Sequence, residues 1–112
     1  AWRLAQSGEA LALFDVASTS SGQCWSITKY CPVPGPVPAS PANNGYKPGF
    51  AAALMLKDLN LSQEAARASG AATPLGAHAT ELFAAFNAAG GAETDFSGII
   101  GFLRGQPGQS KG

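Results

Sequence analysis

The residue that most suggests chemistry is a lysine inside an apolar run. Lys57 lies in the stretch LMLKDLNL, on the same helical stripe as Phe50, Leu54 and Leu61. An ammonium group among apolar neighbours loses hydration, so it either extends to water along its aliphatic stem or meets an anionic partner. Asp58 points roughly 100° away on a helix and need not pair with it. Two interpretations stay open: a lysine at the edge of an amphipathic helix, or a lysine that borders a cleft and faces an anionic ligand.

The two cysteines and the single histidine form no recognisable reactive centre. Cys24 and Cys31 have a C-x6-C spacing that, with one histidine, does not supply the four ligands of a zinc site, so we expect ordinary thiols, one or both buried, and no metal. The pair Cys24-Trp25 resembles the nucleophile segment of papain-like proteases, but His78 follows it too closely in sequence for that family. We expect His78 on a helix surface, where it can pair weakly with Glu81.

Prolines are concentrated in one segment of the chain. Six of the eight fall between Pro32 and Pro48. Each proline fixes φ and removes a hydrogen-bond donor, which predicts an extended strap with few hydrogen bonds over residues 31–49. Such a run can dock in an aromatic groove of a partner, or it can cover the chain's own helices. The apolar flanks at Tyr30 and Tyr46 favour the second interpretation.

The elements that must position these residues are helices. Gly70 is a plausible residue after a helix end, Thr73-Pro74 a helix start, and Asp95 an N-cap. The fold class we predict is all-α, with four or five short helices and one proline-rich strap. Apolar spacing and turn residues predict helices over residues 2–17, 50–69, 73–86 and 95–103, a turn at 18–22 and a short helical turn near 24–28.

Composition and charge exclude several classes of function. The chain has 112 residues, enough for one domain, with seven basic and seven acidic residues and a formal net charge of zero. Without a basic stripe, we expect no nucleic-acid partner. The chain has no apolar run long enough to span a membrane and does not open with a charged-then-apolar leader, so we also expect no membrane partner. Its first residue is Ala1 and not Met, as in a processed chain or a piece of a longer one. It has no glycine-rich phosphate loop, so we expect no complete enzyme site on this chain alone.

The stretch SSGQCWSITKYCPVPGPVPASPANNGYKPGFAAALMLKDLNLSQEAA, residues 20–66, resembles the carboxy-terminal domain of 3-hydroxyisobutyrate dehydrogenases. The similarity extends back to about Leu13 and forward through DFSGIIGFLRG at residues 95–105. The resemblance implies a helical domain like the carboxy-terminal domain of 6-phosphogluconate dehydrogenase. We expect this domain over residues 1–104, incomplete at its amino-terminal end, followed by a flexible tail at 105–112. The Rossmann domain of the family would then lie outside this chain.

The resemblance also implies roles for individual residues. The family's cofactor motif K-D-L-G-x-A-x-D maps onto residues 57–64, with Asn, Ser and Glu at positions 60, 62 and 64 as departures. Lys57 would reach the bound NAD, and Asp58 would orient the site. Phe50 would line the substrate pocket. Trp25 would line the same pocket or support the residues around it. The family's catalytic lysine would lie upstream of this chain.

The family's reaction is the oxidation of 3-hydroxyisobutyrate to methylmalonate semialdehyde in valine degradation, with NAD as hydride acceptor. We therefore expect an NAD-dependent dehydrogenase when complete, inactive and without NAD as this chain alone. Its partners would be a small hydroxy acid, the missing Rossmann domain and a second copy. Its location would be the cytoplasm, or the mitochondrial matrix in a eukaryote. The alternative is a non-catalytic helical assembly module, since an apolar face left uncovered drives association.

Overall fold

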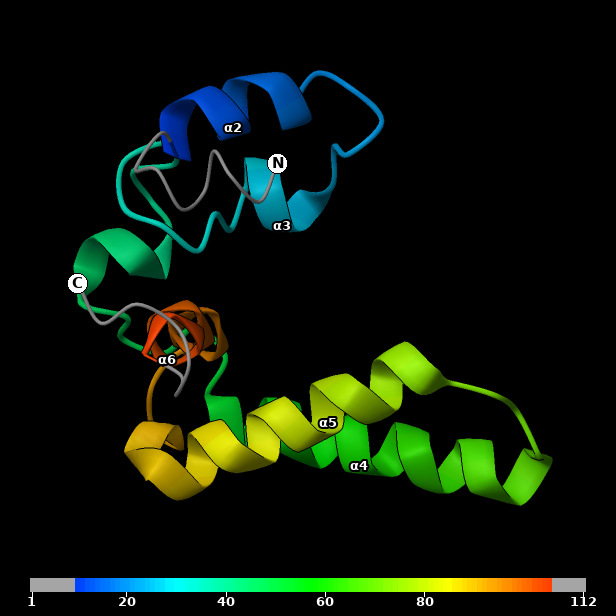
Figure 1. Cartoon of the computed structure of the whole chain (residues 1–112). Helices are drawn as coiled ribbons and strands as arrows, with labels where there is room; N and C mark the ends of the chain where they lie inside the picture. Colours follow the sequence, from blue (N-terminus) through cyan, green and yellow to red (C-terminus); the bar gives the residue numbers. More distant parts are fainter. Residues whose placement is uncertain (1–9, 106–112) are drawn as a thin grey trace. The chain divides into compact units, whose positions relative to one another are not determined.

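The computed structural model describes residues 10–105, which divide between Lys47 and Pro48 into two compact units (Figure 1). Every regular element in this range is helical, which confirms the all-α prediction. The single domain predicted for residues 1–104 stays a prediction, and positions 1–9 and 106–112 lie outside the described residues. No described helix combines the length and the apolar character needed to cross a membrane. The elements are α2 (Ala10–Ala17), α3 (Trp25–Thr28), η1 (Pro41–Asn44), α4 (Ala52–Ser69), α5 (Pro74–Phe86), η2 (Asn87–Gly91), η3 (Phe96–Gly98) and α6 (Ile99–Arg104).

In the described part of the first unit, α2 is followed by a hydroxyl-rich turn in which the chain reverses direction. The backbone N–H of Ser18 bonds the carbonyl of Phe14 at 2.8 Å, and the Ser20 hydroxyl donates to the Val16 carbonyl at 2.7 Å. Short hydroxyl side chains compete for helix carbonyls in this way and so end helices. The turn predicted at 18–22 and the helical turn that follows it, α3, are therefore confirmed.

The proline-rich strap is not extended, contrary to the prediction. It bends and includes the 3-10 helix η1, and the side chain of Asn43 closes it: Oδ1 accepts from the Gly35 N–H at 2.9 Å and Nδ2 donates to the Val37 carbonyl at 2.8 Å. The Tyr46 hydroxyl closes a wider ring by donating to the Pro32 carbonyl at 2.8 Å. Proline has no backbone N–H to donate, but its carbonyl still accepts hydrogen bonds. The side chains of Asn43 and Tyr46, near the end of the strap, supply donors to carbonyls of the strap.

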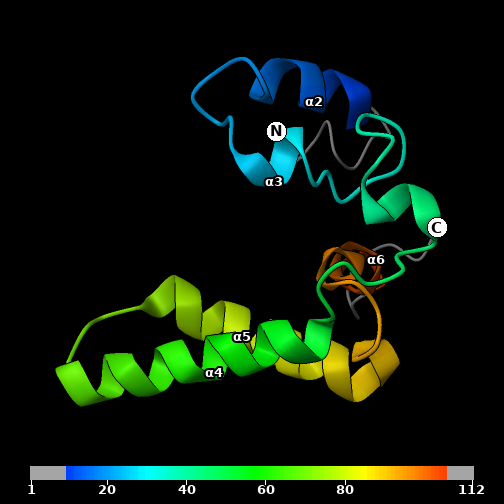
Figure 2. The ribbon, with the colours of Figure 1, turned by 180° about the vertical axis from the view of Figure 1, so that it is seen from behind.

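The second unit is built on an antiparallel pair of helices, α4 and α5, which lie side by side in every view (Figures 1 and 2). Helix α4 ends at Gly70, which adopts φ 74°, and α5 starts with Thr73 at the N-cap and Pro74 in its first turn, as predicted. Thr73 does not cap α5 with its side chain; its hydroxyl pairs with the amide of Gln63 on α4. A Cβ on Gly76 would lie 2.9 Å from that same Gln63 amide nitrogen, so the glycine permits the close approach of the two helices.

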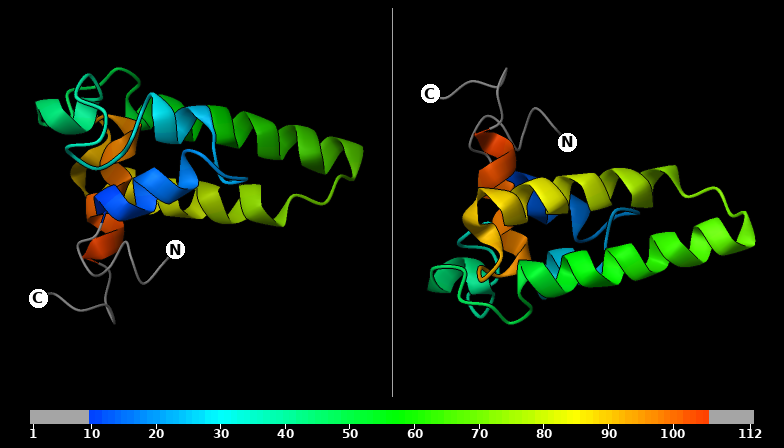
Figure 3. Two further views of the ribbon diagram at one scale, coloured as in Figure 1. Left: turned by 90° about the horizontal axis from the view of Figure 1, so that it is seen from above. Right: turned by 90° about the horizontal axis from the view of Figure 1, so that it is seen from below.

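The core of the unit lies at the open end of this pair, opposite the turn that joins α4 to α5. Helix α6 runs across the hairpin there (Figure 3), and the buried Phe86 ring packs at 5.6 Å from Phe102 and 6.4 Å from Phe83. The apolar spacing that predicts the helix over residues 73–86 puts Leu75 on the same stripe as Phe86, but Leu75 is 85% exposed. Nothing among the described residues covers Leu75, because α6 and η3 pack at the opposite end of the hairpin from it.

Candidate functional site

Helix α4 has two faces of different character, and the predicted lysine is on the exposed one. Its inner face meets α5 and buries Ala52 and Ala66. On the outer face, Leu54 and Leu61 remain 47% and 53% exposed. Both leucines lie on the stripe that includes Lys57. An apolar ridge on the side of a helix opposite its partner is a surface that another part of a protein can cover.

Lys57 and Asp58 lie on either side of this ridge, and both are exposed. The stripe itself faces solvent, so the exposed lysine is compatible with both interpretations, the edge of an amphipathic helix and the border of a cleft. Within residues 10–105, the Lys57 ammonium has no ion-pair partner. It is a cation next to apolar surface, a combination that fits an anionic ligand with flat apolar parts.

Phe50 lies just before the first residue of α4 and is held in place from both sides. Its backbone N–H donates to Asp95 Oδ1 at 3.0 Å, and its carbonyl accepts from the Phe96 N–H at 2.8 Å. Its half-buried ring meets the Phe96 ring edge to face, with centroids 6.0 Å apart. The ring two turns before Lys57 therefore has a fixed position in the same unit.

Asp95 has two structural roles, of which the sequence predicts only the helix cap. Asp95 is predicted as an N-cap, and its side chain does accept from the Ser97 N–H at 3.0 Å. Its second oxygen accepts from Gly49 and Phe50, 46 and 45 residues earlier in the chain. Nothing in the local sequence signals partners at that distance.

The amino-terminal end of α4 does not offer an anion site of its own. The N–H groups of Ala52 and Ala53 donate to the carbonyls of Thr94 and Ala92 at 2.8 and 3.0 Å. Helix amino termini bind anions when such groups are unpaired. In the first two turns of α4, the positive charge is therefore that of the Lys57 side chain and not that of unpaired N–H groups.

Trp25 belongs to the other unit and is 59% exposed. Its indole stacks on the Tyr30 ring with centroids 5.0 Å apart. The neighbouring Cys24 thiol is exposed and the Cys31 thiol is buried, and both are free, as predicted. The stacked aromatic pair supplies a flat apolar surface.

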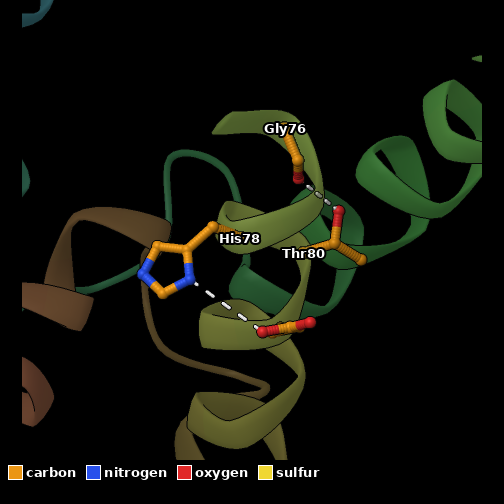
Figure 4. A network of polar contacts seen from close by, with 4 residues as sticks. Gly76, His78 and Thr80 are labelled. Carbon is orange, nitrogen blue, oxygen red and sulfur yellow. Dashed lines mark hydrogen bonds and ion pairs between the residues drawn. The ribbon is translucent and has the colours of Figure 1, made fainter. Parts of the chain in front are cut away.

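His78 lies on the exposed surface of α5, next to Glu81. Its imidazole Nδ1 lies 3.9 Å from a Glu81 carboxylate oxygen, with both side chains largely exposed, so the pair contributes little. Figure 4 shows His78 near Thr80, whose hydroxyl donates to the Gly76 carbonyl at 2.8 Å. Over residues 10–105, no three His, Cys, Asp or Glu side chains gather closely enough to hold a metal ion.

Comparison with known proteins assigns this helical chain to a class. The family model described as "NAD-binding of NADP-dependent 3-hydroxyisobutyrate dehydrogenase" matches residues 7–103. The chain belongs to the 3-hydroxyisobutyrate dehydrogenase family of NAD(P)-binding dehydrogenases and corresponds to the family's carboxy-terminal domain.

Individual relatives agree with this assignment. A probable 3-hydroxyisobutyrate dehydrogenase of Mycobacterium tuberculosis is 55% identical over 95 residues, 85% of this chain and 32% of the relative. The NAD-dependent L-serine dehydrogenase of Pseudomonas aeruginosa is 45% identical over 89 residues, 80% of this chain and 30% of that protein. The human mitochondrial 3-hydroxyisobutyrate dehydrogenase is 39% identical over 92 residues, 82% of this chain and 27% of that one.

A solved structure has the same fold. It is the Mycobacterium tuberculosis 3-hydroxyisobutyrate dehydrogenase with L-serine, which matches with a TM-score of 0.78 and 55% identity over 82% of this chain and 31% of that one. The chain thus spans about a third of the length of the relatives it matches.

Proposed function

We propose that this chain is the helical part of an NAD-dependent dehydrogenase that oxidises 3-hydroxyisobutyrate to methylmalonate semialdehyde in valine degradation. The observation that carries the proposal is Lys57, an unpaired cation beside the exposed Leu54–Leu61 ridge of α4 in a chain of this family. A cation at the edge of an apolar surface attracts an anionic dinucleotide and leaves the apolar part free to contact the rest of the enzyme.

Each predicted site residue has a role in this proposal. The ammonium of Lys57 binds the cofactor, which in the complete enzyme accepts the hydride. Asp58, on the other side of the ridge, orients groups at the same site by accepting hydrogen bonds. Phe50 supplies an apolar wall for the carbon skeleton of the hydroxy acid, and Trp25 extends apolar surface near the substrate.

The remainder of the enzyme in this proposal is the part of the relatives that this chain does not match. A Rossmann domain there binds the cofactor and carries the catalytic lysine, and two or more copies assemble. Alone, the chain is inactive and binds no NAD. The enzyme is located in the cytoplasm, or in the mitochondrial matrix if the source is a eukaryote.

The proposal is tested by placing this chain into the Mycobacterium tuberculosis relative, in exchange for the 95 residues that match. The chimera should reduce NAD in the presence of 3-hydroxyisobutyrate. Loss of the ammonium contact in Lys57→Ala should raise the KM for NAD by about tenfold, equivalent to about 1.4 kcal/mol. Arg67→Ala, which removes an exposed cation in the last turn of the same helix, is the matched control and should leave that KM within about twofold. Equal KM values in the two variants would refute the role of Lys57.

L-Serine is a second candidate substrate. One relative is named as an L-serine dehydrogenase, and the matching structure was solved with L-serine. Both compounds are carboxylic acids with a hydroxyl on the third carbon, and they differ at the second carbon, which carries a methyl group in 3-hydroxyisobutyrate and an amino group in serine. The same oxidation of the hydroxyl therefore applies to each. The ratio of kcat/KM for the two acids in the chimera decides between them.

An assembly module without a catalytic role is the competing function. It is supported by the exposed leucines Leu54, Leu61 and Leu75. If association is the function, the isolated chain should sediment as an oligomer, and replacement of Leu54 and Leu61 by serine should make it monomeric. A monomer at high concentration, together with an active chimera, would exclude the module.

A further inference from the structure

Asp95 makes more hydrogen bonds than a helix cap requires. Its side chain is fully buried. One oxygen, Oδ2, accepts from the N–H and the hydroxyl of Ser97, as an N-cap residue does. The other oxygen, Oδ1, accepts from the N–H groups of Gly49 and Phe50 at 2.9 and 3.0 Å. The carboxylate thus has a capping arm and a second arm that holds the segment before α4.

The second arm is not needed to join the two segments. The N–H of Phe96 donates to the carbonyl of Phe50, and the N–H of Ala52 donates to the carbonyl of Thr94, both at 2.8 Å. These bonds already pair the backbones around the Ala51–Asp95 bridge. What the Oδ1 arm adds is a fixed orientation of the Gly49–Phe50 peptide, from which the Phe50 side chain leaves the backbone.

The orientation of Phe50 is therefore determined at two points. The backbone is held by Asp95 Oδ1, and the ring is held edge to face by Phe96, at 6.0 Å and 80°. Hydrogen bonds to a buried charged acceptor are stronger than neutral ones, so the backbone contact resists displacement. A ring held in this way keeps its position when a small ligand arrives or leaves.

We propose that Asp95 is a positioning residue for the substrate pocket: its Oδ1 arm orients the Gly49–Phe50 peptide and so places the Phe50 ring that contacts the hydroxy acid. This inference rests on the proposed function, since it needs Phe50 to line the pocket. It assigns Asp95 no contact with substrate or cofactor.

Two substitutions separate the arms of the carboxylate. Asp95→Ser retains a good N-cap, because a serine hydroxyl accepts from the N–H of Ser97, but it has no second oxygen for Gly49 and Phe50. Asp95→Asn retains a carbonyl oxygen in the place of Oδ1, while its amide group faces the Ser97 N–H and weakens the cap. The first variant loses the positioning arm and the second loses the capping arm.

The two variants are compared in the chimera with the Mycobacterium tuberculosis relative. Asp95→Ser should raise the KM for the hydroxy acid by about tenfold and leave the KM for NAD within about twofold, because Lys57 lies two turns into α4. Asp95→Asn should leave both KM values within about twofold although it lowers the thermal stability. If Asp95 had only a structural role, the less stable of the two variants would have the higher KM for the hydroxy acid. That result would overturn the proposal.

A double-mutant cycle tests whether the effect passes through Phe50. Phe50→Ala should raise the KM for the hydroxy acid, and Asp95→Ser should add less than about twofold on that background, because the ring it positions is absent. Fully additive effects would overturn the inference while leaving the proposed function intact. A wild-type chimera inactive on both 3-hydroxyisobutyrate and L-serine would overturn the proposed function, and with it the pocket role of Phe50.

The hydrogen bonds themselves are measured in the 112-residue chain, without any activity. Amide hydrogen exchange at Gly49 and Phe50 should accelerate in Asp95→Ser by at least about tenfold relative to the exchange at Ala53. In Asp95→Asn the acceleration should be smaller, because the neutral carbonyl oxygen still accepts from both groups but more weakly than the carboxylate. Unchanged protection of Gly49 and Phe50 in Asp95→Ser would overturn the proposal whatever the chimera does.

Discussion

Replacing Gly91 by alanine introduces one methyl group against a buried aromatic ring. The new Cβ would lie 2.5 Å from Cζ and 2.6 Å from Cδ1 of Phe86. Carbon atoms in contact prefer about 3.5–4.0 Å, so the ring must retreat by about 1 Å. It has little room to do so, because Phe86 is only 7% exposed and packs between Phe83 and Phe102.

The expected loss follows from two opposing contributions. Overpacking a closed core by one methyl costs about 1–3 kcal/mol, and the lower backbone entropy of alanine returns about 0.5–1 kcal/mol. At the middle of both ranges, the free energy of unfolding should therefore fall by about 1 kcal/mol. For a unit of this size, the melting temperature should drop by roughly 4–8 °C, measured by circular dichroism at a helix band.

The chain offers a matched control for this substitution. Gly101 lies inside α6, is exposed, and has no atom within 4 Å of the position its Cβ would take. Gly101→Ala should therefore stabilise the chain by about 0.5–1 kcal/mol. On a Phe86→Leu background, which removes the ring, Gly91→Ala should cost much less. A Gly91→Ala variant as stable as wild type would refute the packing described for this end of the hairpin.

Three further outcomes are expected. Asn43→Ala removes the exposed hydrogen bonds that close the proline-rich strap and should destabilise the first unit by about 0.5–1.5 kcal/mol, measured by urea unfolding through tryptophan fluorescence; an unchanged midpoint would contradict this. In the native chain a thiol reagent should label Cys24 rapidly and Cys31 only after opening, because Cys31 is 5% exposed; equal rates would contradict the burial. Leu75→Ser should change the free energy of unfolding by less than about 0.5 kcal/mol, whereas Leu82→Ala, at a half-buried position of α5, should lower it by about 1 kcal/mol. A larger loss for Leu75→Ser than for Leu82→Ala would show that the tip of the hairpin, where Leu75 lies, is covered.

Local signals in the sequence predicted the helices because each depends on neighbours along the chain. Gly70 ends α4 by adopting a positive φ that alanine avoids, and the Thr73-Pro74 pair starts α5. The cap at Asp95 was predicted for the same reason. These features involve partners within four residues along the chain, so they can be predicted from the local amino-acid sequence.

Features that depend on distant partners were missed or predicted wrongly. The prolines predicted an extended strap because they remove donors, but the amide of Asn43 supplies a donor and an acceptor that fold the strap back. The exposure of Leu54 and Leu61 depends on which side of α4 faces α5, and periodicity alone gives two apolar stripes without ranking them. The candidate site was predicted as far as its residue types, while the contacts that fix Phe50 came only from the structure.

The contacts of Asp95 also imply an order of events in folding. Helices α4 and α5 meet through a short turn, so their pairing requires closing only a small loop, which is fast. The hydrogen bonds from Gly49 and Phe50 to Asp95 close a loop of 45 or more residues and lose correspondingly more chain entropy. We therefore expect the hairpin to form early and the Asp95 closure to form after the rate-limiting step. Weakening that closure should then speed unfolding and leave the refolding rate nearly unchanged.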